Sequence, residues 1–321
     1  MYNYSNQYFC TSERAIMKRA FVKMQGLGND FILFDELAKA SDEVFQLNPD
    51  LAKRLCDRRL GIGADGVFVL SNAADQDEAD IAWDFYNSNG KVAEMCGNAI
   101  RCVARYVYDN DLWPMPAQGI KPVVIVGEDG DLDIDSSDVL NPEVCCGKLK
   151  IKTLAGIISV ELIRDDEDSF IGARVDLGKA TEQSDVVVNS RNFSRIYLGT
   201  PHAITFVNEL PSEFSTPPVT TEGPVVENDP LFPEKTNVEF AEIVNEKLIK
   251  LRVWERNNGE TMACGTGAAA TAVAAYKKGL VGNQIQVQMN GGILSIDIQN
   301  SLRVYMTGPA EMVFTGAIDL T

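Results

Sequence analysis

Two cysteines with matching surroundings carry the most distinctive chemistry in this sequence. Cys96 follows a loop and precedes GNAIRCVARYVYD, and Cys264 follows a loop and precedes GTGAAATAVAAY. Both downstream segments are predicted helices, so each thiol is expected at a helix N-terminus, where unpaired N–H groups and the positive dipole end favour thiolate over thiol. The small residues Gly97 and Gly265 leave those N–H groups open to an anion such as a carboxylate.

Two such thiols suit the inversion of a stereocentre without redox chemistry. One group takes the α-proton from one face while another delivers a proton to the opposite face, and thiols with a pKa near neutrality perform either task. We therefore interpret Cys96 and Cys264 as the acid–base pair of a cofactor-independent amino-acid racemase or epimerase. The other thiols are interpreted as structural: Cys10, Cys56, Cys102, Cys145 and Cys146.

An internal repeat relates the two cysteine segments. Cys96 and Cys264 lie 168 positions apart, DFYNSNG precedes VWERNNG by 169, and GNDFILF precedes GTPHAITF by 171. Three segments in one order at nearly one spacing indicate duplication. The sequence therefore predicts two pseudo-symmetric lobes that each supply one thiol to the cleft between them, with Asn87 as the counterpart of Arg256.

The elements around these motifs are strands and short helices. Runs typical of strands occupy 18–25, 66–70, 80–86, 150–163, 172–178 and 246–255. Asn48 as N-cap and Pro49 at the first position predict a helix over 48–59, whereas the Pro-rich stretch 210–234 is expected to be mostly loop. The expected fold class is α/β (α+β), in which each lobe is a mostly antiparallel sheet or barrel-like layer that encloses a central helix.

The chain is expected to divide into two lobes with two additional segments. The N-terminal lobe takes residues 17–175 plus 307–321, and the C-terminal lobe takes 176–306. Residues 1–16 show no clear period and are expected to be a disordered extension. Residues 112–150 are rich in Pro, Gly and Asp and are expected to form an insertion.

Composition excludes several functional classes. A formal net charge of −17 works against nucleic acid and anionic membranes as partners, and no apolar stretch is long enough to span a bilayer. Seven cysteines, an odd number, argue for reduced thiols. With a single histidine and no CxxC pair, a zinc or iron site would have to use unusual ligands. We expect a cytoplasmic enzyme without metal or cofactor that binds a small amino acid; a homodimer is left open.

Three further features have two interpretations each. His202 either tunes a thiol and holds substrate or is a hydrogen-bonded structural histidine. Glu255 and Arg256 form either a surface ion pair or, through the Arg, a bidentate site for a substrate carboxylate. The GTGAAA segment fits a dinucleotide fingerprint, but no strand directly precedes it and the next acidic residue is Asp297, so an oxidoreductase is a distant alternative.

An ordered set of motifs resembles the diaminopimelate epimerase family from about residue 18 to the end. The motifs are GLGNDF (26–31), GIGADG (61–66), FYNSNG (85–90), EMCGNAIRC (94–102), TLAGIISVEL (153–162), TNVEF (236–240), WERNNGETMACGTGA (254–268) and YMTGPAEMVFTG (305–316). The resemblance implies two similar α/β lobes and epimerisation of LL-diaminopimelate to the meso form without cofactor.

Carried over by motif, the resemblance also implies residue roles. Cys96 and Cys264 would be the paired acid and base, and His202 and Glu255 would adjust their pKa values. The reacting-end carboxylate would lie on the helix N-termini, at Gly97, Asn98, Gly265 and Thr266. The remaining substrate contacts would come from Asn29, Gly66, Asn87, Thr200, Asn237, Glu255 and Arg256.

The chain departs from the family pattern at three of these places. Thr200 stands where the family usually has Asn, Asn257 stands where Gly usually follows the Arg, and Gly66 stands where some members have Gln. A two-cysteine racemase for another amino acid, which Thr200 keeps open, and a non-catalytic binding protein on the same scaffold are the remaining alternatives.

Overall fold

The computed structural model describes residues 18–37, 45–74, 76–112, 148–165, 167 and 169–320. The expected extension at 1–16 and nearly all of the expected insertion at 112–150 lie outside the described residues, as do Cys10, Cys145 and Cys146. Within the described part, strands predominate and four α-helices accompany them.

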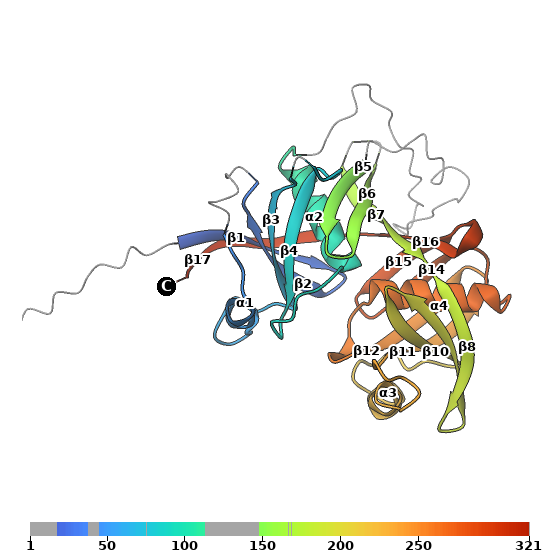
Figure 1. The fold of residues 1–321 in the computed structure, drawn as a ribbon. Coiled ribbons are helices and arrows are strands. Elements are labelled where there is room, and N and C mark those ends of the chain that lie inside the picture. Colours follow the sequence, from blue (N-terminus) through green and yellow to red (C-terminus); the bar gives the residue numbers. More distant parts are fainter. Residues whose placement is uncertain are drawn as a thin grey trace, which may run out of the picture.

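The strands form two groups that lie side by side (Figure 1). The first group contains β1 (Lys18–Gly26), β2 (Asn29–Asp35), β3 (Gly66–Asn72), β4 (Ile81–Asn87), β5 (Lys148–Thr153), β6 (Gly156–Arg164), β7 (Phe170–Lys179) and β17 (Glu311–Asp319). The second contains β8 (Thr181–Val188), β9 (Arg191–Leu198), β10 (Thr200–Val207), β11 (Asn237–Asn245), β12 (Leu248–Glu255), β13 (Gly259–Thr261), β14 (Gln284–Met289), β15 (Gly292–Ile298) and β16 (Arg303–Gly308).

Strand pairing repeats itself from one group to the other. In the first lobe, each strand from β1 to β7 pairs with the next one. The pairs β2–β3 and β4–β5 are parallel, and the other four are antiparallel. In the second lobe, the strands pair in the order β9, β10, β11, β12, β14, β15 and β16. The corresponding pairs, β10–β11 and β12–β14, are again parallel, and the other four are antiparallel. This agreement confirms two pseudo-symmetric lobes of mostly antiparallel strands.

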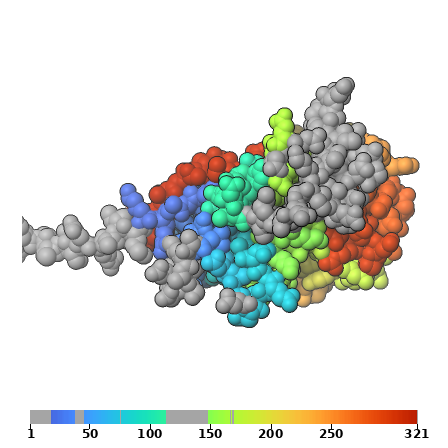
Figure 2. Space-filling view, turned by 90° about the horizontal axis from the view of Figure 1, so that it is seen from above, coloured from blue at the N-terminus to red at the C-terminus, as the bar shows by residue number. Residues whose placement is uncertain are grey.

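The chain crosses between the lobes twice. After β7 it enters the second lobe, where β8 pairs with β9, and after β16 it returns, so that β17 pairs with β1. Figure 2 shows this return as the red end of the chain beside the blue start. An antiparallel pairing of β7 with β16 joins the two sheets, which therefore curve around their helices without closing into separate barrels.

One long helix lies inside each lobe and one short helix lies outside. The inner helices, α2 (Gly97–Asp109) and α4 (Gly265–Lys277), pack against most strands of their own lobes and share one hydrophobic core. The outer helices, α1 (Pro49–Cys56) and α3 (Val219–Glu227), cover two smaller cores. In α4 the buried alanines allow the strands a close approach while they favour the helix.

The structure corrects the end of one outer helix. Asn48 caps α1 as predicted, its side chain accepting from the Leu51 N–H at 3.0 Å, but the helix ends at Cys56 and not at residue 59. The stretch 210–234 is mostly loop, as expected, and contains one helix, α3, despite Pro224 inside it. Val219 and Val226 are buried beneath β11 and β12, and this packing outweighs the low helix propensity of proline.

Candidate active site

Cys96 is the N-cap residue of α2. Its extended backbone, with φ −146° and ψ 114°, ends the loop after β4 and directs the chain into the helix at Gly97. Cys96 is partly buried as a residue, and its thiol lies 3.9 Å from the Asn29 Oδ1, to which it donates. The sequence expectation that Cys96 begins a helix is confirmed.

Cys264 is the N-cap residue of α4. Its backbone is again extended, with φ −129° and ψ 110°, and its Sγ accepts from the Gly267 N–H at 3.3 Å. The Thr266 hydroxyl lies 3.6 Å from the same sulfur. The short strand before α4, β13, pairs antiparallel with β12, so the GTGAAA segment does not open the helix of a parallel βαβ unit, as a dinucleotide fingerprint requires.

The N-termini of α2 and α4 meet at one methionine. A Cβ on Gly97 would lie 2.8 Å from Met306 Cε, and a Cβ on Gly265 would lie 2.7 Å from Met306 Sδ. A direct bond also joins the two ends, because the Asn98 Nδ2 donates to the Ala263 carbonyl at 3.3 Å. The two helix N-termini, each capped by a cysteine, therefore lie side by side at the junction of the lobes.

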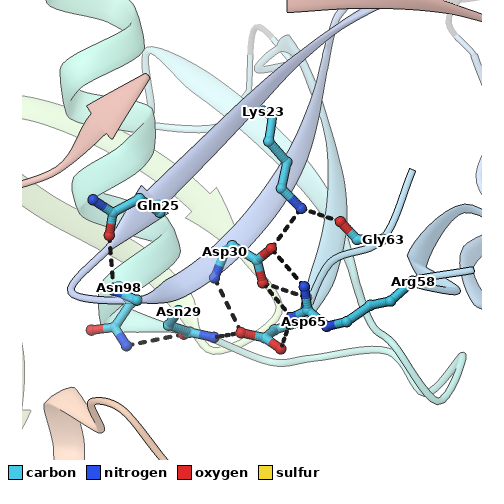
Figure 3. Close-up of polar contacts among 9 residues, drawn as sticks. Lys23, Gln25, Asn29, Asp30, Arg58, Gly63, Asp65 and Asn98 are labelled. Atoms are coloured by element: carbon cyan, nitrogen blue, oxygen red, sulfur yellow. Dashed lines mark hydrogen bonds and ion pairs between the residues drawn. The ribbon is translucent and has the colours of Figure 1, made fainter. Parts of the chain in front are cut away.

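Asn29, at the start of β2, links the Cys96 thiol to a row of polar side chains. Its Oδ1 accepts from Asn98 Nδ2 at 3.0 Å, and its Nδ2 donates to Asp65 Oδ2 at 2.7 Å (Figure 3). Arg101, fully buried on α2, fixes the orientation of the Asn98 amide by donating to its Oδ1 at 2.9 Å. Each amide in this row is thus held in one orientation.

Two basic and two acidic side chains form an ionic cluster that contacts this row through Asp65. Arg58 contacts both Asp30 and Asp65, at 2.7 and 2.8 Å, and Lys23 reaches Asp30 and the Gly63 carbonyl (Figure 3). Burial opposes ionisation of Asp30, but the hydrogen bonds from Arg58 and Lys23 lower its pKa to about 2. Burial, followed by the charge of Asp30, raises the pKa of Asp65.

The second lobe supplies a different polar row. The backbone N–H of Arg256 donates to Asn237 Oδ1 at 2.9 Å, and Asn237 Nδ2 donates to Thr200 Oγ1 at 3.2 Å. Thr200 Oγ1 lies 3.1 Å from His202 Nε2, and His202 Nδ1 lies 2.6 Å from Glu239 Oε1. The structure thus joins Thr200, His202, Asn237 and Arg256, all expected from the sequence, into one hydrogen-bonded row.

Glu255, the last residue of β12, acts on both thiols. Its Oε1 accepts from the Thr261 hydroxyl at 2.6 Å, and its charge raises the pKa of Cys96 and of Cys264. Burial raises the pKa of Glu255 itself, while contacts with Thr261 and the Cys264 thiol lower it. A carboxyl group with a raised pKa beside a thiol is suited to exchange a proton with it.

The pKa values of the thiols shift in the direction opposite to the sequence expectation. Burial raises the pKa of Cys96 to about 11, against smaller opposing effects of the α2 N–H groups. Burial, with the charges of Glu255 and Glu239, also raises the pKa of Cys264. The helix N-terminus favours thiolate as predicted, but loss of solvation outweighs it in the free protein.

Strand registers correct one pairing of the repeat. Phe31 pairs with Gly66 as His202 pairs with Asn237, so Gly66 and Asn237 are counterparts. Val67 lies opposite Tyr86 as Val238 lies opposite Trp254. The next residues along, Asn87 and Glu255, are therefore counterparts, whereas the sequence alignment had placed Asn87 opposite Arg256.

Among the described residues, no group of three or more His, Cys, Asp or Glu side chains could hold a metal ion. No described helix has the length and hydropathy needed to cross a membrane. Cys56 and Cys102, interpreted as structural thiols, are both buried away from the helix N-termini.

Comparison with known proteins shows the family and the fold. The family model for diaminopimelate epimerase matches residues 21–182 and 194–313. The chain belongs to the diaminopimelate epimerase family. The diaminopimelate epimerase of Heliobacterium modesticaldum is 37% identical over 318 residues, which are 94% of this chain and 99% of the relative. That of Carboxydothermus hydrogenoformans is 39% identical over 312 residues, covering 92% and 98%.

Solved structures share the two-lobe fold at low sequence identity. A hydroxyproline epimerase from Agrobacterium vitis has a TM-score of 0.63 at 14% identity, covering 94% of this chain and 93% of that chain. A PhzF-family phenazine biosynthesis protein from Bacillus anthracis has a TM-score of 0.60 at 12% identity, covering 94% and 99%. These similarities confirm the fold that the motifs of the diaminopimelate epimerase family implied.

Two departures from the family pattern have a clear structural setting. Thr200, in place of the usual Asn, accepts from Asn237 Nδ2 at 3.2 Å and lies 3.1 Å from His202 Nε2. Gly66 leaves room for the Phe85 ring, because a Cβ there would lie 2.5 Å from Phe85 Cε2. Gly66 itself has no side chain to offer a ligand, so its expected contact would have to come from the backbone.

Sequence reasoning missed four residues of the site region. Three of them form hydrogen bonds with predicted site residues: Asp65, Arg101 and Glu239. The fourth, Met306, lies next to both Gly97 and Gly265. All four lie in quoted family motifs, so a closer inspection of those motifs could have singled them out. Asp65 lies 36 positions from Asn29, Glu239 lies 37 positions from His202, and Met306 lies 205 positions from Arg101, however, and spacing alone does not reveal such contacts.

Proposed function

We propose that this chain is a diaminopimelate epimerase that interconverts LL-2,6-diaminopimelate and meso-diaminopimelate by a two-base mechanism. The observation that carries the proposal is the meeting of two cysteine-capped helix N-termini at Met306. One thiol from each lobe suits the attack on opposite faces of a single α-carbon. Membership of the family supplies the substrate.

The proposed reaction conserves atoms and electrons without a further reactant. The thiolate of one cysteine takes the α-proton, so that the C–H bond breaks, an S–H bond forms and the electron pair remains on the substrate. The thiol of the other cysteine then gives its proton to the opposite face and becomes the thiolate. Cys96 and Cys264 exchange protonation states in each turnover, and the reverse reaction uses them in the opposite order.

The substrate carboxylate at the reacting end is expected to bind at the two helix N-termini. The first N–H groups of an α-helix have no partner within the helix, and the dipole favours an anion there. Gly97, Asn98, Gly265 and Thr266 are the first two residues of α2 and α4. A carboxylate on these groups also withdraws charge from the α-carbon, which makes its proton easier to remove.

One thiol has to lose its proton before it can act as the base, although burial opposes this in the free protein. The ammonium group of an amino acid offsets that effect, because a nearby cation stabilises thiolate. Glu255, whose pKa is raised and which contacts Cys264, is our proposed acceptor for the proton. Substrate binding would therefore create the active protonation state.

The distal end of the substrate is expected to contact both lobes. The Arg256 Nη1 donates to the Glu234 carbonyl at 3.1 Å, and its remaining N–H groups suit a carboxylate. In the first lobe, the Asn87 side chain makes no hydrogen bond to any residue that the structure describes, which leaves its amide for a ligand. Asn29 and Asn237 complete the proposed set of polar contacts.

Proton exchange at the α-carbon in D₂O tests the proposal. The wild-type protein is expected to incorporate deuterium into LL-diaminopimelate and to form the meso isomer. Cys96→Ala and Cys264→Ala are each expected to abolish epimerisation with unchanged circular dichroism. Full epimerisation by either variant would contradict the two-base mechanism.

A second candidate function is racemisation of another amino acid, and Thr200 is the observation that favours it. A hydroxyl there replaces the amide that the family usually has. The same exchange assay with histidine, glutamate and proline separates the two candidates. Exchange in one of these but not in diaminopimelate would overturn the named substrate and keep the chemistry.

We also propose that the protein works in the cytoplasm, in the synthesis of lysine and of cell-wall precursors. The four cysteines in the described part of the chain are free thiols, and the mechanism needs two of them reduced. Fractionation of cells that express the tagged chain, with activity measured in each fraction, tests the location.

A further inference from the structure

His202 and Glu239 form an ion-pair contact in the interior of the second lobe. His202 Nδ1 lies 2.6 Å from Glu239 Oε1, and both side chains are 0% exposed. The other carboxyl oxygen, Glu239 Oε2, is buried and has no hydrogen-bond partner among the described residues. Burying such a group costs free energy, so a role other than stability is the natural reason for its presence.

The first lobe shows that the fold does not need this polar pair. The strand registers make Phe31 the counterpart of His202 and Phe68 the counterpart of Glu239. The two phenylalanine rings lie 6.2 Å apart in the core of the first lobe. The same positions of the repeated fold are therefore filled by an apolar pair in one lobe and by a titratable pair in the other.

The pair ends a hydrogen-bonded row to which we assign one direction. Asn237 Nδ2 donates to Thr200 Oγ1, and Thr200 Oγ1 lies 3.1 Å from His202 Nε2. His202 Nδ1 lies 2.6 Å from Glu239 Oε1, and because an ionised carboxylate can only accept, Nδ1–H donates to it when Glu239 is ionised. An acceptor carboxylate at the end of the row thus selects the tautomer with its proton on Nδ1.

Glu239 also lies close to the Cys264 thiol. A Cβ built on Gly267 would be 3.0 Å from Glu239 Oε1 and 3.2 Å from Cys264 Sγ. The charge of Glu239 is one of the causes that raise the pKa of Cys264. A change of charge on the pair therefore acts on the catalytic thiol at short range.

We propose that Glu239 is a positioning residue that orients His202 through Nδ1 and thereby sets the row that ends beside Cys264. This inference rests on the proposed function, because its kinetic consequence requires the two-thiol reaction. Glu239 touches neither the substrate nor the reacting atoms in this assignment. It acts through His202. The two positions that hold this titratable pair in the second lobe hold Phe31 and Phe68 in the first lobe.

Two titratable groups outside the pair, Cys264 on α4 and Glu255 at the end of β12, interact with it. Three charged side chains on the neighbouring elements have partners elsewhere: Arg252 with Glu260, Glu227 with Trp254 and Lys235, and Arg195 over the Phe232 ring. The pH dependence of the site therefore has to be interpreted with Cys264, Glu255 and the pair together.

A tautomer measurement tests the proposal without substrate. His202 is the only histidine in the chain, so its imidazole ¹⁵N signals are assigned without ambiguity. The folded protein is expected to show protonated Nδ1 and an unprotonated, hydrogen-bonded Nε2 at alkaline pH. A tautomer protonated only on Nε2 would overturn the assignment. This result does not depend on the variant folding.

Kinetics of Glu239→Gln give the second test. The amide can still accept from Nδ1–H, but it stabilises an imidazolium less than a carboxylate does. We expect kcat to fall about tenfold or more, KM to change less than about threefold, and the acidic limb of the pH–rate profile to move to lower pH. An unchanged kcat and pH profile would overturn the positioning role.

Phe68→Leu is the matched control, because it alters the counterpart of Glu239 in the first lobe. It is expected to lower the melting temperature but to leave the shape of the pH–rate profile unchanged. A failure of the wild-type chain to exchange the α-proton would refute the proposed function instead. A normal wild-type reaction with an insensitive Glu239→Gln variant would refute only the inference about Glu239.

Discussion

Alkylation of Cys96 as a function of pH tests the balance between burial and helix N–H groups. Burial raises the pKa of this thiol to about 11, from an ordinary 9.0. At neutral pH the thiolate fraction is then about 10⁻⁴ instead of about 10⁻², so alkylation is about a hundredfold slower than that of an ordinary thiol. The rate is expected to keep rising up to a pH of about 11.

The assay uses Cys264→Ala, in which Cys96 is the only thiol at the site. Iodoacetamide labelling from neutral to alkaline pH is followed by peptide mass spectrometry, with circular dichroism at each pH to confirm folding. Cys56 and Cys102, whose pKa values burial raises to about 12, serve as internal controls. The midpoint of the profile is the decisive quantity, because limited access lowers the rate at every pH without moving the midpoint.

A second variant tests the cause of the shift. Burial is the largest cause for Cys96, and the charge of Glu255 adds to it. Combining Cys264→Ala with Glu255→Gln removes that charge, so the midpoint is expected to move to lower pH. A midpoint near the ordinary value of 9.0 in Cys264→Ala alone would refute the dominance of burial.

Three further predictions concern stability. Gly66→Ala places a Cβ 2.5 Å from Phe85 Cε2, so the urea-unfolding free energy is expected to fall by about 1–3 kcal/mol. Asn48→Ala removes the α1 cap and is expected to cost about 1 kcal/mol in the same measurement. Because the pKa of Asp30 is lowered to about 2, its stabilisation is present above its ordinary pKa of 3.8 and is lost as the pH falls toward 2; Asp30→Asn is expected to flatten thermal stability against pH in that window.

Local signals were sufficient to predict much of the fold. The N-cap and Pro signal at Asn48 and Pro49 located the start of α1, and the Cys-Gly steps located the starts of α2 and α4. Apolar runs located seven of the seventeen strands that the structure describes, namely β1, β3, β4, β5, β6, β7 and β12. The spacing of repeated segments predicted the two lobes. The helix starts and the strands depend on residues within one turn or one strand, and the two lobes on segments that recur in one order; sequence patterns record both directly.

Features that depend on long-range contacts were not predictable in the same way. Helix α3 forms in a Pro-rich segment because Val219 and Val226 are buried against strands of the second lobe. The thiol pKa values follow from solvent exclusion by both lobes, which no local motif reports. The row from Asn237 to Glu239 brings together strands whose register is visible only in the folded sheet.

The two halves of the site are alike at the N-terminus of the inner helix and differ at the ends of the neighbouring strands. Both halves keep a cysteine at the N-cap of the inner helix, as the inversion of one carbon requires. The halves differ at the strand ends, where Gly66 and Asn87 correspond to Asn237 and Glu255. A substrate whose reacting carbon meets equivalent groups on its two faces, and whose distal end meets unequal ones, fits this division. Duplication thus explains the symmetric chemistry, and divergence at the strand ends is where we expect substrate choice to be decided.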